Sequence, residues 1–264
     1  MQNQLEAIVI RTRPYGENNK IVTLFTKEAG KITCMARGAK KPASRLAAIT
    51  QPFTHGVFSI YKGRGMGTLQ AGDQLESLRY IREDIMATAY ASYVTELVDR
   101  LTEQDEPQPA IYDMLYQALH AIADGYDPEA ITLFVEWKML RVAGLTPTLH
   151  ECANCGATEG EFAFSFQELG FLCHRCFHLD RYIIRLSPAL VKLIRTFYFV
   201  PIERVGAGHA LEAEAEEGHG AVWVTTGNAR GPVLAHEPIR VVRPRPARRR
   251  HDDERLEAVA DTVF

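Results

Sequence analysis

The first eighty residues alternate between short runs of β-branched and apolar residues and polar turns marked by glycine. The runs span residues 5–12, 20–27, 31–38, 53–63 and 66–77. Gly16 opens the turn after the first run, Ala29-Gly30 separates the second from the third, and three glycines (63, 65 and 67) lie at the junction of the last two. Short β-branched runs bounded by turn residues predict strands. We therefore expect five strands in this part of the chain.

The segment "SRLAAIT" at residues 44–50 interrupts the strand pattern between the third and fourth runs. It is long enough for one helical turn or more. Five strands with an insertion at this point is the layout of an OB-fold barrel. An SH3-like barrel shares the strand count, so the count alone does not decide between the two folds. The insertion favours the OB-fold.

Residues 81–147 change to a spacing of three to four between apolar positions, which predicts helices. In 81–104 the repeating apolar residues are Ile81, Ile85, Ala89, Tyr93, Leu97 and Leu101. A second such segment is 108–125, and a third, 128–147, opens with proline and closes at Gly144 and Pro147. Three amphipathic helices joined by short turns predict a helical bundle.

Four of the five cysteines form two C-x-x-C pairs, and we expect them to bind a structural Zn²⁺. The candidate ligands are Cys152, Cys155, Cys173 and Cys176. Four thiolates close a tetrahedral zinc site and leave no open position for catalysis. Phe162, Phe164 and Phe166 alternate with small or polar residues, a strand period, and a turn at 168–170 leads into a second strand. This arrangement predicts a zinc ribbon. We expect the nearby histidines, at 150, 174 and 178, to be surface residues rather than ligands.

Two other interpretations of these cysteines are a pair of disulfides and a thioredoxin-like redox motif. The chain shows no signal peptide, no apolar run long enough to cross a membrane and an odd number of cysteines, which favours a reducing cytoplasm. No βαβ pattern surrounds either pair, as a thioredoxin-like motif would require. Cys34 lies alone in an apolar strand pattern, and we expect it to be a small core residue.

Charge divides the chain more sharply than its total suggests. The 264 residues are 46% hydrophobic, as in globular proteins, and the length suggests two or three domains. The net charge is only −3, yet residues 1–80 carry 12 Lys and Arg against 5 Asp and Glu, whereas residues 81–150 carry 4 against 12. A basic domain followed by an acidic one suggests that the first part of the chain binds a polyanion.

The basic residues of the predicted barrel lie at turns and strand ends, with aromatic residues among them. OB-folds bind single strands in this way, because cations follow the phosphates and rings stack on bases. The candidate DNA-binding residues are Arg11, Arg13, Lys31, Arg37, Lys40, Lys41, Arg45, Lys62 and Arg64, with Tyr15 and Tyr61 as candidates for base stacking. A solvated basic loop over a phenylalanine core explains any single residue as well, but the cluster as a whole favours nucleic acid.

Three segments resemble the bacterial RecO family of recombination mediators. "RTRPYGENNKIVTLFTKEAGKITCMARGAKKPASR" (11–45) resembles its N-terminal signature, "FVEWKMLRVAGLTPTLHECANCG" (134–156) its approach to the zinc knuckle, and "LSPALVKLIR" (186–195) the helix that follows. The resemblance covers about residues 1–205 and implies an α+β multidomain fold: an N-terminal OB-fold β-barrel, a helical bundle domain and an inserted four-cysteine zinc ribbon. We expect an OB-fold DNA-binding domain at 1–80, a helical domain at 81–149, a zinc ribbon at 150–180, a return helix of the helical domain at 181–205 and an atypical tail at 206–264.

The resemblance also implies a function. RecO-like proteins bind single- and double-stranded DNA and anneal complementary strands in DNA repair and recombination. They act with RecR, and in some bacteria RecF, and contact the single-strand-binding protein (SSB) while helping RecA load onto coated strands. A protein of this kind is not an enzyme, is cytoplasmic and nucleoid-associated, and has no membrane partner. The alternative is a zinc-ribbon adaptor that uses its OB-fold for protein or RNA contacts.

The sequence agrees with a non-enzymatic protein, because the chain has no P-loop, GxSxG or HExxH motif.

The composition changes abruptly after Val205. Residues 206–264 contain no Lys and no Tyr, and their aromatic residues are Trp223 and Phe264. The resemblance implies amphipathic helices in this segment, but its apolar residues show no helical spacing. The change is typical of an alternate reading frame or a divergent tail, so we expect an incomplete helical domain and leave the basic run at 243–250 out of the candidate sites.

Overall fold

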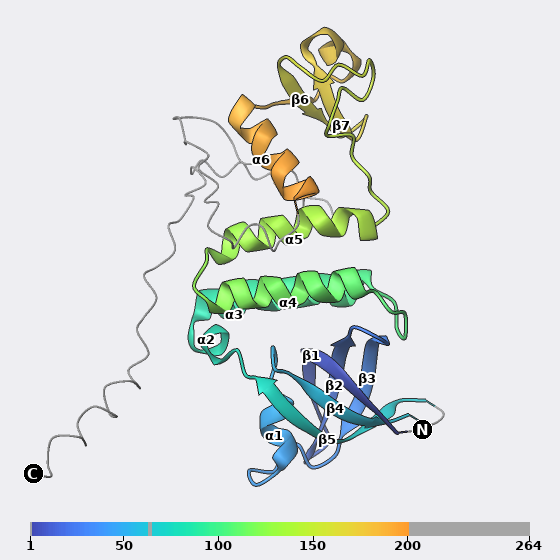
Figure 1. Ribbon diagram of the computed structural model, residues 1–264, viewed down its shortest axis with the longest axis vertical. Coiled ribbons are helices and arrows are strands. Elements are labelled where there is room, and N and C mark those ends of the chain that lie inside the picture. The colour runs from blue at the N-terminus through green and yellow to red at the C-terminus, as the bar shows by residue number, and fades with distance from the viewer. Residues whose placement is uncertain (1, 63–64, 201–264) are drawn as a thin grey trace, which may run out of the picture.

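The computed structural model describes residues 2–62 and 65–200, and the predicted tail at 206–264 lies outside this part of the chain. A β-barrel forms one end of the described molecule and a small β-ribbon forms the other (Figure 1). Helices are stacked between them, so the two parts that the sequence marks as candidate sites lie far apart.

The N-terminal strands close into a barrel with one helix inserted, which confirms the predicted OB-type architecture. The elements are β1 (Gln2–Tyr15), β2 (Asn19–Thr26), β3 (Gly30–Ala36), α1 (Arg45–Ile49), β4 (His55–Tyr61) and β5 (Gly67–Glu76). The strand order around the barrel is β1-β2-β3-β5-β4, and β3 pairs with β5 in parallel while the other pairs are antiparallel. Helix α1 follows β3, where the sequence predicted a helical turn.

Strand β1 is long because it pairs with two neighbours in succession. Its first half pairs with β4 and its second half with β2, and the register shifts between Val9 and Arg11. A shift of this kind bends a strand and lets the sheet close. Ala7 and Val9 point into the barrel core, whereas Ile8 and Ile10 belong to the core shared with the helices. Residues 7–10 of the strand are all apolar because both faces of the strand are covered there.

The first predicted helix is two helices. Helix α2 (Arg79–Glu83) ends at Asp84, and α3 (Ile85–Leu101) begins there. Asp84 has an extended backbone, and its carboxylate accepts hydrogen bonds from the amides of Met86 and Ala87. Aspartate is favoured as an N-cap because it satisfies amides that lack a partner within the helix. The prediction of one helix from 81 was wrong, because the apolar spacing hid this cap.

The break also changes which residues of α3 are buried. The predicted stripe included Ile85, Ala89 and Tyr93, but all three are exposed, Ile85 to 85%. The buried face comprises Ala87, Ala91, Val94, Thr95, Leu97 and Val98. An apolar period fixes the relative spacing of core residues, but the way the helix docks decides which stripe faces the core.

Helix α5 lies at the centre of the helical layer (Figure 1). The remaining helices are α4 (Pro109–Ala123), α5 (Pro128–Val142) and α6 (Pro188–Phe199), and α5 packs against α3, α4 and α6. Helix α5 buries residues all round its circumference, including Phe134 and Trp137, as expected for a helix covered on several sides. None of the helices in the described part of the chain combines the length and the apolarity needed to cross a membrane.

The second sheet has three short strands. They are β6 (Phe162–Ser165), β7 (Gly170–Cys173) and β8 (Ile184–Arg185), in the order β7-β6-β8, with the 3-10 helix η1 (His174–Leu179) after β7. The predicted hairpin is confirmed, but Phe166 lies in its turn and is 52% exposed. All four residues of β6 are buried, so neither face of this strand is exposed to solvent. The cysteine loop is hydrogen-bonded to β7, and Arg195 of α6 lies over the rings of Phe162 and Phe171.

Candidate functional site

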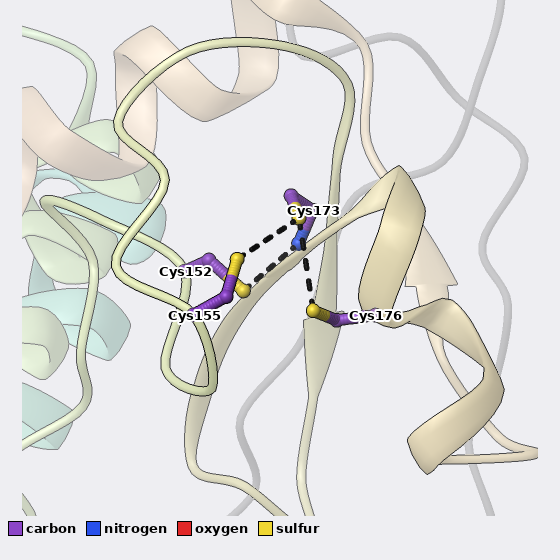
Figure 2. A group of neighbouring side chains, drawn as sticks. All are labelled: Cys152, Cys155, Cys173 and Cys176. Carbon is purple, nitrogen blue, oxygen red and sulfur yellow. Dashed lines mark hydrogen bonds between the residues drawn. The ribbon is translucent and has the colours of Figure 1, made fainter.

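The four predicted ligand cysteines come together at the end of the β6–β7 hairpin. Cys152 and Cys155 belong to the loop that precedes β6, Cys173 ends β7, and Cys176 lies in η1 (Figure 2). One backbone hydrogen bond, from the Cys152 amide to the Ala157 carbonyl, closes the loop on itself. Another, from the Ala153 amide to the Phe171 carbonyl, holds the loop against β7, and the Cys173 amide donates to Cys152 Sγ. Two segments separated in sequence are thereby fixed side by side.

The distances between the sulfur atoms fit a tetrahedral metal centre. All four Sγ atoms lie within 4.8 Å of one another. Cys155 Sγ is 3.6 Å from Cys173 Sγ, and Cys173 Sγ is 3.8 Å from Cys176 Sγ. A zinc ion with bonds of about 2.3 Å to sulfur separates its ligands by about 3.8 Å, the edge of the tetrahedron. No disulfide links these cysteines, and Cys155 alone is exposed.

The protein environment already favours a thiolate at one position of the cluster. Burial raises the pKa of Cys152, but hydrogen bonds from the backbone amides of Cys173, Cys155 and Asn154 outweigh it and lower that pKa to about 6. The Asn154 amide donates to Cys176 Sγ at 3.3 Å. Backbone and amide donors of this kind stabilise negative charge on sulfur, as a site for a cation requires.

The side chains around the cluster support it without joining it. The three histidines at 150, 174 and 178 are exposed, as expected, and the group within 4.8 Å contains cysteines alone. Asp180 is buried and accepts a hydrogen bond from Ser165 Oγ at 2.7 Å and another from the Tyr182 amide at 2.8 Å. These bonds lower the pKa of Asp180 and tie the chain after η1 to strand β6.

Cys34 lies in the barrel core, far from the other four cysteines. It is fully buried on β3, and its thiol donates to the Val22 carbonyl at 3.6 Å. Burial raises the pKa of the Cys34 thiol to about 12. The prediction of a small core residue is confirmed.

The end of the barrel that points away from the helices gathers most of the predicted basic residues. The loop from 37 to 44 joins β3 to α1, which lies at this end in Figure 1. The loop packs on the β1–β2 turn, because the Lys40 amide donates to the Asn18 carbonyl and Lys40 Nζ contacts the Gly16 carbonyl at 3.3 Å. Arg13, Arg37, Lys40, Lys41 and Arg45 are all exposed there, together with Tyr15. We call this set of residues the basic end.

The two predicted stacking residues do not share one site. Tyr15 is the last residue of β1 and is 53% exposed, so it belongs to the basic end. Tyr61 is 50% exposed but pairs with Gln2 at the start of β1. Thirteen residues of strand separate the two positions, up to about 40 Å along an extended chain. Only Tyr15 lies beside the basic loop.

Two predicted DNA-binding cations face the helices instead. Lys31 Nζ lies 3.2 Å from the Asp99 carboxylate and 2.7 Å from the Thr102 carbonyl, and it also donates to the Asp99 carbonyl. Arg11 binds the other carboxylate oxygen of Asp99 at 2.9 Å. The Lys31 side chain is only 12% exposed. Both residues therefore hold the barrel on α3, and the structure places them away from the basic end.

The last two predicted cations are Lys62, which follows β4, and Arg64. Lys62 Nζ forms an ion pair with Asp105 at 2.5 Å, in the loop between α3 and α4. Arg64 lies outside the described residues. The sequence analysis also missed Lys20, which lies on β2 between Pro14 and Ala36 at the basic end. Its Nζ donates to Thr50 Oγ1 at 3.2 Å, and burial lowers the pKa of Lys20. A lysine at the start of an apolar strand gave no signal of its own.

Comparison with known proteins gives matches along most of the chain. The family model described as "Recombination protein O N terminal" matches residues 1–78, and "Recombination protein O C terminal" matches residues 82–222. The DNA repair protein RecO of Bacillus subtilis (strain 168) is 50% identical over 206 residues, which is 78% of this chain and 81% of that protein.

Two further relatives show the same extent of similarity. The DNA repair protein RecO of Bacillus pumilus (strain SAFR-032) is 51% identical over 201 residues, 76% of this chain and 78% of that protein. The protein of the same name from Listeria monocytogenes serovar 1/2a (strain EGD-e) is 50% identical over 201 residues, 76% and 79% of the two chains. Since both family models match in order, over the barrel and over the helices with the cysteine ribbon, the chain belongs to the RecO family.

Proposed function

We propose that this protein is a non-enzymatic DNA-binding mediator of DNA repair that contacts DNA through the basic end of its barrel. Membership of the RecO family supports the role in DNA repair. The observation that carries the contact surface is the packing of the loop at 37–44 on the β1–β2 turn. That packing places five exposed cations and the exposed ring of Tyr15 on one end of the molecule.

The chemistry of this end suits a polyanion of varied sequence. Lysine provides a flexible point charge for phosphates, whereas base specificity needs fixed bidentate donors. Lys40 and Lys41 are therefore proposed as phosphate contacts, and Tyr15 as a stacking platform for an unpaired base. Between residues 11 and 45 only Glu17 and Glu28 are acidic. The acidic helices lie at the other side of the barrel (Figure 1), where they do not oppose DNA at the basic end.

Further parts of this proposal rest on the family resemblance. They are annealing of complementary strands, and loading of RecA on SSB-coated single strands together with RecR, in the cytoplasm at the nucleoid. We also propose the domain boundaries expected from the sequence and one structural Zn²⁺ held by Cys152, Cys155, Cys173 and Cys176. The metal would supply folding energy to the ribbon and no reaction chemistry, because four protein ligands fill its shell.

Titration of fluorescently labelled oligonucleotides tests the proposed contact. Single- and double-stranded DNA should both bind, and affinity should fall steeply as salt rises, because each phosphate contact releases counterions. Replacing Lys40 and Lys41 together with glutamate should weaken both forms and flatten the salt dependence by about two units of slope, one per lost contact. Strand annealing should fall in parallel.

A matched control reverses two exposed charges far from the basic end. Arg181→Glu with Lys192→Glu changes the ribbon and α6 by the same total charge, and DNA affinity should stay close to that of the parent. If the Lys40/Lys41 variant binds and anneals DNA as well as the parent at the same salt, the basic end is a solvated surface. If the parent itself binds no DNA, the zinc-ribbon adaptor with protein or RNA partners becomes the better account.

A further inference from the structure

A polar cluster lies at the joint between the barrel and helix α4, apart from both the basic end and the cysteines. Three barrel strands and one helix contribute to it. Its members are Glu6 on β1, His55 on β4, Glu76 on β5, and Tyr112, Tyr116 and His120 on α4. His55 is buried and His120 is half-buried, whereas the two carboxylates reach the protein surface. We call this set the histidine joint.

Both ring nitrogens of His55 face carboxylate oxygens. Nδ1 is 3.0 Å from Glu76 Oε2, and Nε2 is 2.9 Å from Glu6 Oε1. An ionised carboxylate only accepts hydrogen bonds, and neutral imidazole has only one N–H to donate. Both contacts are made at once only when the ring carries two protons, which makes His55 a cation.

The same reasoning applies independently to His120. Its Nδ1 lies 2.8 Å from the Tyr116 backbone carbonyl, which is an acceptor under all conditions. Its Nε2 lies 2.7 Å from Glu76 Oε2. With acceptors on both sides, this ring also needs both protons. The geometry therefore calls for two imidazolium cations in one joint.

Glu76 supplies a negative charge next to both of these cations. Its Oε2 receives His55 Nδ1, His120 Nε2 and, at 3.4 Å, the hydroxyl of Tyr116, so three donors converge on one oxygen. Burial opposes ionisation of Glu76, but the charges and hydrogen bonds of His120 and His55 outweigh it and lower the pKa of this carboxyl. A protonated Glu76 in place of a protonated histidine is therefore disfavoured.

A shared metal ion is the other species that could bring imidazoles and carboxylates together. Within the described ranges 2–62 and 65–200, the four cysteines are the one group whose ligand atoms are all close enough for that. The ring nitrogens also contact carboxylate oxygens directly, at hydrogen-bond distances of 2.7 to 3.0 Å. Protons, not a metal, hold the joint.

We propose that His55 and His120 form a proton-dependent latch between the barrel and helix α4. When either ring loses a proton, a nitrogen lone pair faces an oxygen lone pair across less than 3.1 Å. The joint then exchanges a charge-assisted hydrogen bond for repulsion. The latch is closed at mildly acidic pH and weakens as pH rises. Strong acid weakens it too, since Glu76 then takes up a proton.

The other charged groups at this joint are not expected to mask the effect. Lys27 on the β2–β3 turn pairs with Asp113 on α4 at 2.8 Å, and Glu28 lies near Tyr112. None of these groups ordinarily changes charge between about pH 6 and about pH 8.5. Burial and nearby carboxylates raise the pKa values of Tyr112 and Tyr116, so both stay neutral in that range. Histidine is the side chain that titrates there.

Thermal unfolding at two pH values tests the latch. Between about pH 6 and about pH 8.5 the midpoint of the parent should fall by about 4 °C, and His120→Gln should remove roughly half of that fall. Glutamine donates one hydrogen bond without titrating. His55→Gln should act in the same direction. If this buried substitution does not fold, His120→Gln still decides the question, because His120 is only half-buried.

Two control variants separate the latch from simple packing. Tyr116→Phe removes a hydroxyl of the joint but no titrating group, so it should lower the midpoint equally at both pH values. Lys192→Gln replaces an exposed charged residue of α6 and should change neither the midpoint nor its pH dependence. If His120→Gln shows the same fall with pH as the parent, the proposal is wrong, and the joint is an ordinary neutral hydrogen-bond network.

Discussion

Replacing Asp99 with asparagine removes the charge that joins the barrel to helix α3. The Asp99 side chain is 9% exposed and lies between Arg11 and Lys31, at 2.9 and 3.2 Å. Asparagine keeps the shape and one carbonyl oxygen. Lys31, only 12% exposed, would then keep its backbone carbonyl partners but lose its counter-charge.

The expected loss lies between the extremes known for ion pairs. Removing one partner of a fully buried pair costs about 3–5 kcal/mol, because the remaining charge stays desolvated. The retained carbonyl of Thr102 offsets part of that cost for Lys31. Arg11 is 46% exposed and adds at most about 1 kcal/mol. We expect Asp99→Asn to lower the free energy of unfolding by about 2–3 kcal/mol.

Thermal and denaturant unfolding give the measurement, with Asp113→Asn as the matched control. Asp113 on α4 pairs with Lys27 of the barrel, but both side chains are nearly half exposed, so its loss should cost much less than the loss of Asp99. A difference of 2–3 kcal/mol corresponds to roughly 6–9 °C in midpoint for a chain of this size. Equal effects of the two substitutions would refute the claim that burial makes the Asp99 contacts strong.

The contact of Lys31 with Asp99 on α3 predicts a structural role for this lysine. Lys31→Met should lower stability while DNA affinity per folded molecule stays unchanged, in contrast to Lys40 and Lys41 at the basic end. A variant that folds normally and loses DNA binding would return Lys31 to the proposed DNA contacts.

Three further predictions concern the cysteines and one turn. Protein purified without chelator should contain about one zinc per chain. Cys176→Ser should lower the stability of the ribbon more than it lowers DNA affinity, because metal binding is folding free energy. Four thiols paired as disulfides would contradict this. Cys34 should resist maleimide in the native state at about pH 8, since its raised pKa and burial withhold the thiolate, and should react once the protein unfolds. Gly30→Ala should destabilise more than Gly125→Ala: both glycines have positive φ, but a Cβ at Gly30 would overlap the Glu106 backbone, whereas Gly125 faces open space. Equal losses would show that the turn moves freely.

Local sequence patterns were sufficient for the elements whose signals lie within a few residues. The five strands, the helix after β3 and the β6–β7 hairpin follow from β-branched runs and turn residues, and the structure places each within a few positions of its expected range. The spacing of two C-x-x-C pairs was enough to predict that four sulfur atoms would meet. The ends of helix α5 followed from Pro128 at its start and from Gly144 just after it.

The apolar period was a weaker guide where two signals competed. Ile81, Ile85 and Ala89 share a helical spacing, yet Asp84 caps a new helix between them. Capping depends on whether one residue adopts an extended backbone, and the docking of α3 on the barrel decides that. Ile85 thus became one of the most exposed apolar residues of the described chain.

Tertiary structure alone decided what each charged residue does. Lys31 and Lys40 look alike in the sequence, as cations beside a turn of the same small barrel. Lys31 lies on the strand that meets α3, so Asp99, sixty-eight residues away, neutralises it. Lys40 lies at the other end, where it meets the backbone of the β1–β2 turn and solvent.

The histidine joint makes the same point more strongly. His55 and His120 have no motif in common and stand 65 positions apart in the numbering. The β4–β5 hairpin pairs His55 with Glu76, and the packing of helix α4 against the barrel brings His120 to the same carboxylate. The sequence determined which elements form, since propensity and periodicity act over a few residues. Charge pairing acts through space, so only the packed barrel and helices determined which cations face solvent and which hold the protein together.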